Sequence, residues 1–221
     1  MAGFGERPRA LIVDFGGVLT VAEDGVFAAF CRESGADPER LGAIVAGAFD
    51  GSDPNGIVAR RERGSLSLED FERALASALS EGLSRPIDPA GLYRRLFSAE
   101  RIDDAMMAAI GRLRAAGIRT AMLSNTWGDG EAQDSLSDAF DAMVLSGRLG
   151  MRKPEPAIFL AASAALGVEP RACVLVDDVM ANVRAAEAVG MHGIHHLRTG
   201  ATVAELARLF GLMLATAEDP R

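Results

Sequence analysis

The chain has 221 residues, 49% of them hydrophobic and 24% charged, the composition of an ordinary globular protein with one large domain or a core plus a smaller one. Its net charge of −8 disfavours nucleic acid or an anionic membrane surface as the main partner. Its two cysteines, Cys31 and Cys173, are too few and too far apart for a disulfide framework or a metal site. No signal-peptide pattern or membrane-length apolar run is found, so we expect a reduced, cytoplasmic protein.

One carboxylate, Asp14, directly follows an apolar run near the start of the chain. The run predicts a buried β-strand, and the next glycines, Gly16 and Gly17, end it and let backbone amides approach a ligand. Ligands of open α/β sheets lie at the carboxyl ends of strands, so Asp14 is a candidate catalytic residue. An aspartate that merely caps a turn has the same local pattern, so the rest of the chain must decide between the two.

From about residue 21 to residue 99, helical patterns follow one another without a convincing strand. Apolar residues recur at helical spacing, and Ser67 with Asp70 resembles a capping box at the start of the clearest helix. The block therefore predicts a small helical bundle. Its expected helices are 25–34, 38–49, 57–63, 67–79 and 89–97.

Beyond Ile102 the pattern changes to alternating helices and strands, which predicts a parallel sheet covered on both faces. Glycines at 117, 167 and 190 end three of the expected helices. The expected helices are 103–116, 154–166, 181–189 and 203–209, and the expected strands are 118–123, 141–145, 172–176 and 192–196.

The helical block is predicted to be an insertion into the sheet domain, because a crossover between parallel strands needs only about a dozen residues. We therefore expect an α/β fold with a doubly wound, Rossmann-like parallel sheet, in which the strands lie in the order 3-2-1-4-5. The core would comprise residues 1–19 and 101–221, and the inserted helical cap residues 20–100. An insertion beside the carboxyl end of the first strand is placed to act as a lid.

Short polar clusters follow three of the predicted strands, and right-handed crossovers bring those strand ends to one edge of the sheet. Each residue alone has an ordinary alternative as a turn residue, a helix cap or a surface lysine. Together, the carboxylates suit Mg²⁺, and the hydroxyl and ammonium groups suit a phosphate. The candidates are Asp14, Ser124, Asn125, Lys153, Asp177 and Asp178.

The order and spacing of four motifs resemble the haloacid dehalogenase-like (HAD) hydrolases with a helical C1-type cap, over residues 9–197. The resemblance implies a Mg²⁺-dependent phosphatase of a small phosphorylated metabolite that works through an aspartyl phosphate, as a monomer or homodimer. The motifs are 14–18 (DFGGV), 123–126 (LSNT), 152–159 (RKPEPAIF), and 176–178 (VDD) followed by Asn182 and Gly190-Met191.

The same resemblance implies a role for each candidate residue. Asp14 would be the nucleophile, and Lys153 would assist catalysis. The phosphate would be bound by Ser124, Asn125 and Lys153. The Mg²⁺ ligands would be Asp14, the backbone carbonyl of Gly16, Asp178, and Asp177 through a water molecule.

Gly16 departs from the pattern of the family, whose phosphatases usually have a second aspartate two residues after the nucleophile. General acid–base assistance is worth ~10²–10⁴-fold in rate. The protein could be a phosphatase restricted to good leaving groups, or one helped by another acid or by the substrate. A dehalogenase-type hydrolase and a non-enzymatic or regulatory protein are the alternatives. The pair Asp177-Asp178 favours phosphate over halide, and some phosphatases of the family have a glycine at this position.

Two further features of the sequence have open interpretations. Arg60, Arg61 and Arg63 could contact an anion from the lid, although a charge run on a helix is more often a solvated face. Trp127, the only tryptophan, could stack on a substrate or pack against the cap.

Overall fold

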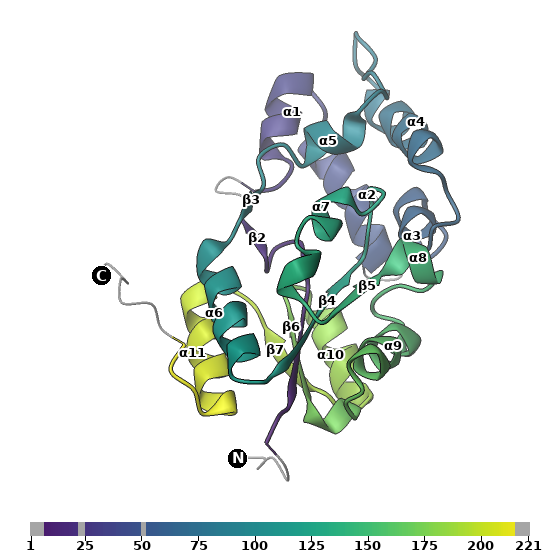
Figure 1. The fold of residues 1–221 in the computed structure, drawn as a ribbon. Helices are drawn as coiled ribbons and strands as arrows, with labels where there is room; N and C mark the ends of the chain where they lie inside the picture. Colours follow the sequence, from purple (N-terminus) through teal and green to yellow (C-terminus); the bar gives the residue numbers. More distant parts are fainter. Residues whose placement is uncertain (1–6, 22–24, 50–51, 215–221) are drawn as a thin grey trace.

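The computed structural model describes residues 7–21, 25–49 and 52–214, with a parallel sheet in the lower part and a helical lobe above it (Figure 1). The sheet has the order β5-β4-β1-β6-β7, and each neighbouring pair is parallel. This confirms the predicted order 3-2-1-4-5 and the doubly wound α/β class. The strands are β1 (Ala10–Val13), β4 (Arg119–Ser124), β5 (Ala142–Leu145), β6 (Cys173–Asp177) and β7 (His192–His195).

Helices cover both faces of the sheet: α6 (Asp104–Ala115) and α11 (Thr199–Phe210) lie on one face, and α9 (Pro156–Leu166) and α10 (Met180–Ala188) on the other (Figure 1). In the central strand, Leu11 and Val13 join the hydrophobic cluster that includes α6 and α11, whereas Ala10 and Ile12 join the cluster of α9 and α10. Alternate side chains of β1 are thus buried on opposite faces, which explains its continuous apolar sequence.

The upper lobe has its own hydrophobic core, built around Phe71, Leu75 and Leu79. Ser67 caps its longest helix by accepting a hydrogen bond from the Asp70 N–H at 3.0 Å, as the sequence predicts. The predicted helices occur, but the first begins at Ala28 and the last at Leu92, each three residues later than predicted. The cap helices are α1 (Ala28–Ser34), α2 (Pro38–Phe49), α3 (Ile57–Glu62), α4 (Leu68–Ser80) and α5 (Leu92–Leu96).

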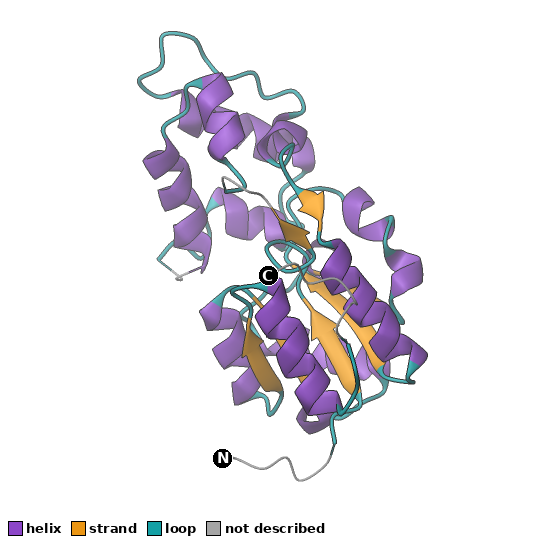
Figure 2. Cartoon of the chain, turned by 90° about the vertical axis from the view of Figure 1, so that its left-hand side faces the viewer, coloured by secondary structure: helices purple, strands orange, loops and turns teal. Residues whose placement is uncertain are grey.

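The two chain segments that join the lobes pair as a short antiparallel ribbon, visible between the lobes in Figure 2. Its strands are β2 (Thr20–Val21) and β3 (Arg101–Ile102). The sequence predicts neither of them, because two residues cannot display a period. The exact domain bounds at 19/20 and 100/101 stay a prediction, and residues 1–6 and 215–221 of the predicted core lie outside the described ranges.

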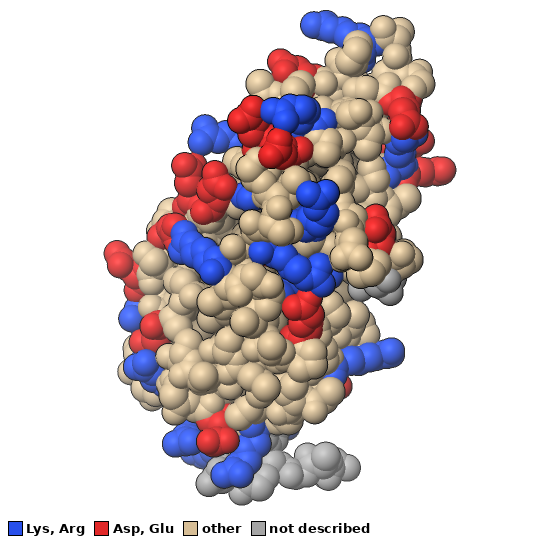
Figure 3. Space-filling model, turned by 90° about the vertical axis from the view of Figure 1, so that its right-hand side faces the viewer, with Lys and Arg blue, Asp and Glu red and all other residues tan. Residues whose placement is uncertain are grey.

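Four further short elements were not predicted, since one turn of helix carries no periodic signal: α7 (Glu131–Asp134), α8 (Ser146–Leu149), η1 (Ser137–Ala139) and η2 (Pro170–Ala172). The last helix, predicted over 203–209, begins earlier, at Thr199. Among the described residues, no helix has both the length and the hydropathy needed to span a bilayer. On the face drawn in Figure 3, basic and acidic side chains lie interspersed rather than in one continuous basic patch.

Candidate active site

Asp14 lies at the carboxyl end of the central strand, where its backbone is fixed to the neighbouring strand. Its N–H donates to the carbonyl of Val176 at 2.9 Å. Its Oδ1 accepts a hydrogen bond from the N–H of Phe15 at 2.7 Å and lies 2.7 Å from Nζ of Lys153. Both contacts fall on one oxygen of a carboxylate that is only 8% exposed. The side chain is thus held in one orientation, with Oδ2 left for a ligand.

The two glycines in the turn after Asp14 have different surroundings: there is no space for a side chain at Gly17, but there is at Gly16. The N–H groups of Leu19 and Thr20 both donate to the carbonyl of Phe15, at 2.8 and 3.1 Å. Gly17 has φ +71°, and a Cβ there would lie 2.3 Å from Oδ2 of Asp178, so glycine is required. A Cβ on Gly16 would meet nothing within 4 Å. Gly16 therefore has room for a side chain that the sequence does not provide.

Lys153 is buried rather than solvated, which rules out the surface alternative. It is 1% exposed, and its Nζ lies 2.7 Å from Asp14 Oδ1 and 2.7 Å from Asp177 Oδ2. Burial alone would lower the pKa of this lysine, but the charges of Asp14 and Asp177 raise it above its ordinary value. The ammonium is therefore charged, and it links the ends of β1 and β6.

Asp177 and Asp178 occupy different environments at the end of β6. Asp177 is fully buried, and its Oδ1 accepts from the N–H of Val179 and from Nδ2 of Asn182, each at 2.9 Å. Asp178 is exposed towards the cavity. Ser124, 2% exposed at the end of β4, lines the same cavity. The structure thus brings the predicted residues to one edge, while their individual roles stay predictions.

The acidic cluster has more negative than positive charge. Ligand oxygens of Asp14, Asp177 and Asp178 lie within 4.8 Å of one another, and Lys153 is the one ammonium paired with them in the described chain. Burial raises the pKa of Asp14 well above its usual value, Lys153 opposes that rise, and the other two aspartates reinforce it. Oδ1 of Asn182 is buried beside them without a hydrogen-bond partner among the described residues. This oxygen-rich, negatively charged set fits a divalent cation such as Mg²⁺.

Asn125 holds Lys153 in place through its carboxamide. Its Oδ1 accepts from the N–H of Lys153 at 2.9 Å, and its Nδ2 donates to the carbonyl of Lys153 at 3.1 Å. The same Nδ2 also lies 3.2 Å from Oε2 of Glu62. Both polar atoms of the carboxamide thus have partners within the protein. The predicted contact of Asn125 with phosphate stays a prediction.

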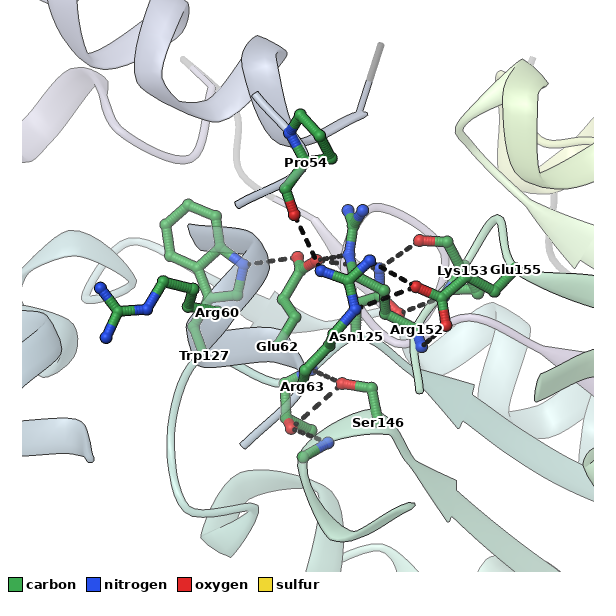
Figure 4. Close-up of polar contacts among 12 residues, drawn as sticks. Pro54, Arg60, Glu62, Arg63, Asn125, Trp127, Ser146, Arg152, Lys153 and Glu155 are labelled. Carbon is green, nitrogen blue, oxygen red and sulfur yellow. Dashed lines mark hydrogen bonds and ion pairs between the residues drawn. The ribbon is translucent and has the colours of Figure 1, made fainter. Parts of the chain in front are cut away.

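Glu62, at the end of α3, is a site neighbour that the sequence analysis missed. It is fully buried, accepts from Nε1 of Trp127 at 2.9 Å, and forms an ion pair with Arg152 of the core (Figure 4). Burial raises the pKa of Glu62, while Arg152 and the Trp127 hydrogen bond oppose the rise. Its spacing from the buried Val58 and Ala59 places it on the inner face of the helix. That spacing is the signal in the sequence that could have identified Glu62.

The three arginines near Glu62 differ in their contacts and exposure. Arg61 is buried and donates to the backbone carbonyls of Trp127 and Gly128, each at 2.6 Å, so it is neither a solvated charge nor a substrate contact. Arg63 pairs with Glu155 at 2.6 Å. Arg60 is exposed and points away from this network (Figure 4). Two of the three thus join the cap to the core, and for Arg61 neither open interpretation, an anion contact or a solvated face, is correct.

Trp127 packs against the cap, in agreement with the second interpretation of this residue. Its ring stacks on Phe27 at a centroid distance of 6.0 Å and meets Phe71 and Phe97 edge-on at 5.7 and 5.5 Å. Only 7% of the side chain is exposed, and that part borders the cavity. The tryptophan therefore forms part of the wall rather than a free stacking platform.

A cavity of about 270 Å³ is lined by residues of both lobes, Asp14 and Lys153 among them. The core contributes most of its polar lining, with Glu62 added from the cap and Glu100 from the second linker, and the cap contributes most of its apolar wall. Lys153 is the only cationic residue among the described residues that line it. The apolar and aromatic lining residues are Val26, Phe27, Val45, Tyr93 and Phe97 of the cap and Phe15, Trp127 and Val179 of the core.

Comparisons with known proteins agree with this architecture. The family model of the haloacid dehalogenase-like hydrolases matches residues 8–190. Acyl-CoA dehydrogenase family member 10 of Mus musculus is 32% identical over 216 residues, but these cover 95% of this chain and only 20% of that protein. Sesquiterpene phosphatase astK of Aspergillus oryzae is 30% identical over 158 residues, covering 68% of this chain and 77% of the phosphatase.

A solved structure shares the fold. The HAD family enzyme from Bacteroides thetaiotaomicron, crystallised with magnesium and inorganic phosphate, has a TM-score of 0.59 at 22% identity, covering 85% of this chain and 93% of that one. At this identity the likeness concerns the fold alone. The present chain thus spans nearly all of one structural neighbour, but only a fifth of the mouse relative.

Proposed function

Because the chain belongs to the haloacid dehalogenase-like hydrolase family, we propose that this hydrolase is a Mg²⁺-dependent phosphatase that works through an aspartyl phosphate. The observation that carries the proposal is the contact of a buried ammonium, Lys153, with Asp14, which forms a three-carboxylate cluster with Asp177 and Asp178. A lone capping aspartate would need neither the lysine nor the additional acids. The excess of negative charge supports a bound cation, and a cation beside an ammonium supports an anionic substrate.

In the proposed reaction, Asp14 attacks the phosphorus atom through Oδ2, because Phe15 and Lys153 already occupy Oδ1. Lys153 and the hydroxyl of Ser124 would stabilise the charge that develops on the phosphoryl oxygens. The bond from phosphorus to the alcohol oxygen breaks. Water then attacks the phosphorus of the aspartyl phosphate, which releases inorganic phosphate and restores Asp14.

Asp14, Asp178 and the carbonyl of Gly16 would hold the Mg²⁺, with Asp177 beside them. When bound, Mg²⁺ supplies Lewis-acid stabilisation of the phosphoryl charge. The HAD enzyme crystallised with magnesium and inorganic phosphate supports this assignment by fold analogy. Asp177 also orients Lys153 through the 2.7 Å ion pair, which keeps the ammonium directed at the phosphate position.

The wall of the cavity favours a phosphate ester of an apolar alcohol. Aromatic residues such as Phe27, Phe97 and Trp127 line the cavity and would face the leaving group. Among the described lining residues no cation besides Lys153 is present to bind a second phosphate or a carboxylate. Burial of apolar area contributes roughly 25 cal/mol per Å², so an aromatic or terpenoid group would gain affinity there. The sesquiterpene phosphatase among the relatives agrees with this substrate class.

A panel of phosphate monoesters tests the proposal, with phosphate release measured in Mg²⁺ and again in EDTA. Aryl and terpenyl phosphates are expected to be hydrolysed with higher kcat/KM than sugar phosphates, and EDTA should abolish the turnover. Absence of Mg²⁺-dependent phosphate release from every ester would contradict the proposal and favour a binding or regulatory protein. Metal-independent chloride release from 2-haloacids would instead establish a dehalogenase.

A further inference from the structure

The proposed phosphatase needs a proton donor for its leaving group, and the turn after Asp14 has none at Gly16. We propose that Glu100, which reaches the cavity from the second linker between the lobes, donates this proton and later activates the water. The inference rests on the proposed phosphatase function. It assigns a catalytic role to a residue outside the four sequence motifs.

Glu100 is connected to the turn that carries Gly16. Thr20 Oγ1 donates to Glu100 Oε1 at 3.1 Å, and Gly17 N–H donates to Thr20 Oγ1 at 3.3 Å. The carboxylate is therefore two hydrogen bonds from the residue that follows Gly16. The pairing of β2 with β3 fixes this arrangement, since Thr20 begins β2 and Glu100 immediately precedes β3.

Glu100 also faces the same cavity as the nucleophile. Asp14, Gly16 and Glu100 all line it, and the open space beside Gly16 leaves the approach free. Tyr93 of the aromatic wall lines the same cavity as Glu100. Burial and, secondarily, the charge of Glu100 raise the pKa of Tyr93. The leaving alcohol is expected between this wall and Asp14, so its oxygen would lie within reach of Glu100.

Glu100 is the acid in this cavity best suited to carry a proton. Burial raises its pKa, and only the hydrogen bond from Thr20 opposes the rise. Glu62, the other glutamate that lines the cavity, already accepts from Trp127 and pairs with Arg152. The remaining lining acids of the described chain, Asp14 and Asp178, belong to the acidic cluster.

The proton balance closes over two steps. As Asp14 forms its bond to phosphorus, the bond from phosphorus to the alcohol oxygen breaks, and that oxygen takes the proton of Glu100. The Glu100 carboxylate then accepts a proton from the water that attacks the aspartyl phosphate. Inorganic phosphate leaves, Asp14 is restored, and Glu100 is again protonated.

A matched pair of esters provides the test. The para-nitrophenolate ion leaves without a proton, whereas para-nitrobenzyl alcohol needs one, although the two groups differ little in shape and polarity. In Glu100→Gln, the ratio of kcat/KM for para-nitrophenyl phosphate to that for para-nitrobenzyl phosphate should rise by roughly 10²-fold or more over the wild-type ratio. The same substitution at the exposed Glu131 is the matched control and should leave the ratio unchanged.

A second variant distinguishes a loss of activity caused by the missing proton donor from one caused by misfolding. Gly16→Asp places a carboxyl group in the open space beside Asp14, on a backbone that is not left-handed. Added to Glu100→Gln, it should restore hydrolysis of the benzyl ester, which a merely structural defect would not allow. An unchanged ester ratio in Glu100→Gln overturns the role of Glu100. Failure of the wild type to hydrolyse either ester overturns the proposed function itself.

Discussion

Two buried charge clusters lie close together in this protein, and they differ in charge balance. The first joins Lys153 to Asp14 and Asp177, with Asp178 beside them, so that three carboxylates face one ammonium. The second joins Glu62 of the cap to Arg152 of the core, one charge against one. Both clusters border the cavity, but Glu62 of the second also accepts hydrogen bonds from Trp127 and Asn125.

This difference separates a site for a ligand from a structural connection. A cluster with excess charge is incomplete without a counter-ion, and it costs stability that the rest of the fold must supply. In a balanced pair the two charges neutralise each other without a bound ion, although Nη2 of Arg152 has no hydrogen-bond partner among the described residues. Substitutions in the two clusters should therefore have opposite effects on activity and on stability.

The largest effect on activity is expected from Asp14→Asn. The variant loses the proposed nucleophile, so kcat/KM for an apolar aryl phosphate should fall by roughly 10³-fold or more. Its free energy of unfolding should stay the same or rise, because one crowded carboxylate is removed while Lys153 keeps Asp177. Steady-state kinetics and urea unfolding measure the two quantities. Retained Mg²⁺-dependent turnover would rule out Asp14 as the nucleophile.

Glu62→Ala should produce the reverse pattern, a large loss of stability. Arg152 would remain buried at 3% exposure without its partner, which is expected to cost about 3–5 kcal/mol. Replacing both residues, as Glu62→Leu with Arg152→Met, should recover much of that loss in urea unfolding. The exposed pair Arg94–Glu131 is the control, and Glu131→Ala should cost no more than about 1 kcal/mol. Equal losses at Glu62 and Glu131 would refute the distinction.

Mg²⁺ binding should relieve the excess charge of the first cluster. At a free Mg²⁺ concentration of about 100 times its Kd, the wild type should gain about 2.7 kcal/mol of unfolding free energy. The measurement is thermal unfolding with Mg²⁺ and with EDTA. Asp178→Asn should lose most of this gain, and the exposed Asp104→Asn should keep it. An equal gain in both variants would exclude Asp178 as a ligand.

The smallest effect is expected from Trp127→Phe. The ring packing against Phe27 and Phe71 is largely kept, but the 2.9 Å hydrogen bond to Glu62 is lost. One hydrogen bond to a buried charged group is worth about 1.5–3 kcal/mol, and water reaching Glu62 from the cavity should reduce the observed loss towards the lower value. Urea unfolding measures it. No loss of stability would mean that Glu62 does not depend on this donor.

The elements predicted from sequence are those with long periodic patterns. The continuous apolar run of β1 and the amphipathic stripe of α4 are visible in the residues themselves, and both occur where predicted. The ribbon of Thr20–Val21 and Arg101–Ile102 was missed, because its pairing joins segments some eighty residues apart and only two residues contribute on each side. Glu100 was missed for the same reason, since its hydrogen-bond partner Thr20 lies on the other linker.

The sequence by itself determined the family, the order of the strands and the edge where Asp14, Ser124, Lys153 and Asp178 gather, because local patterns and the handedness of crossovers settle these features. Only the tertiary structure decided which charges are paired. It buried Lys153 between two aspartates, turned Arg61 into a link between cap and core, and placed Glu100 at the cavity. Burial and charge pairing depend on contacts between residues far apart in the chain, and the local sequence pattern does not show which of these residues meet in space.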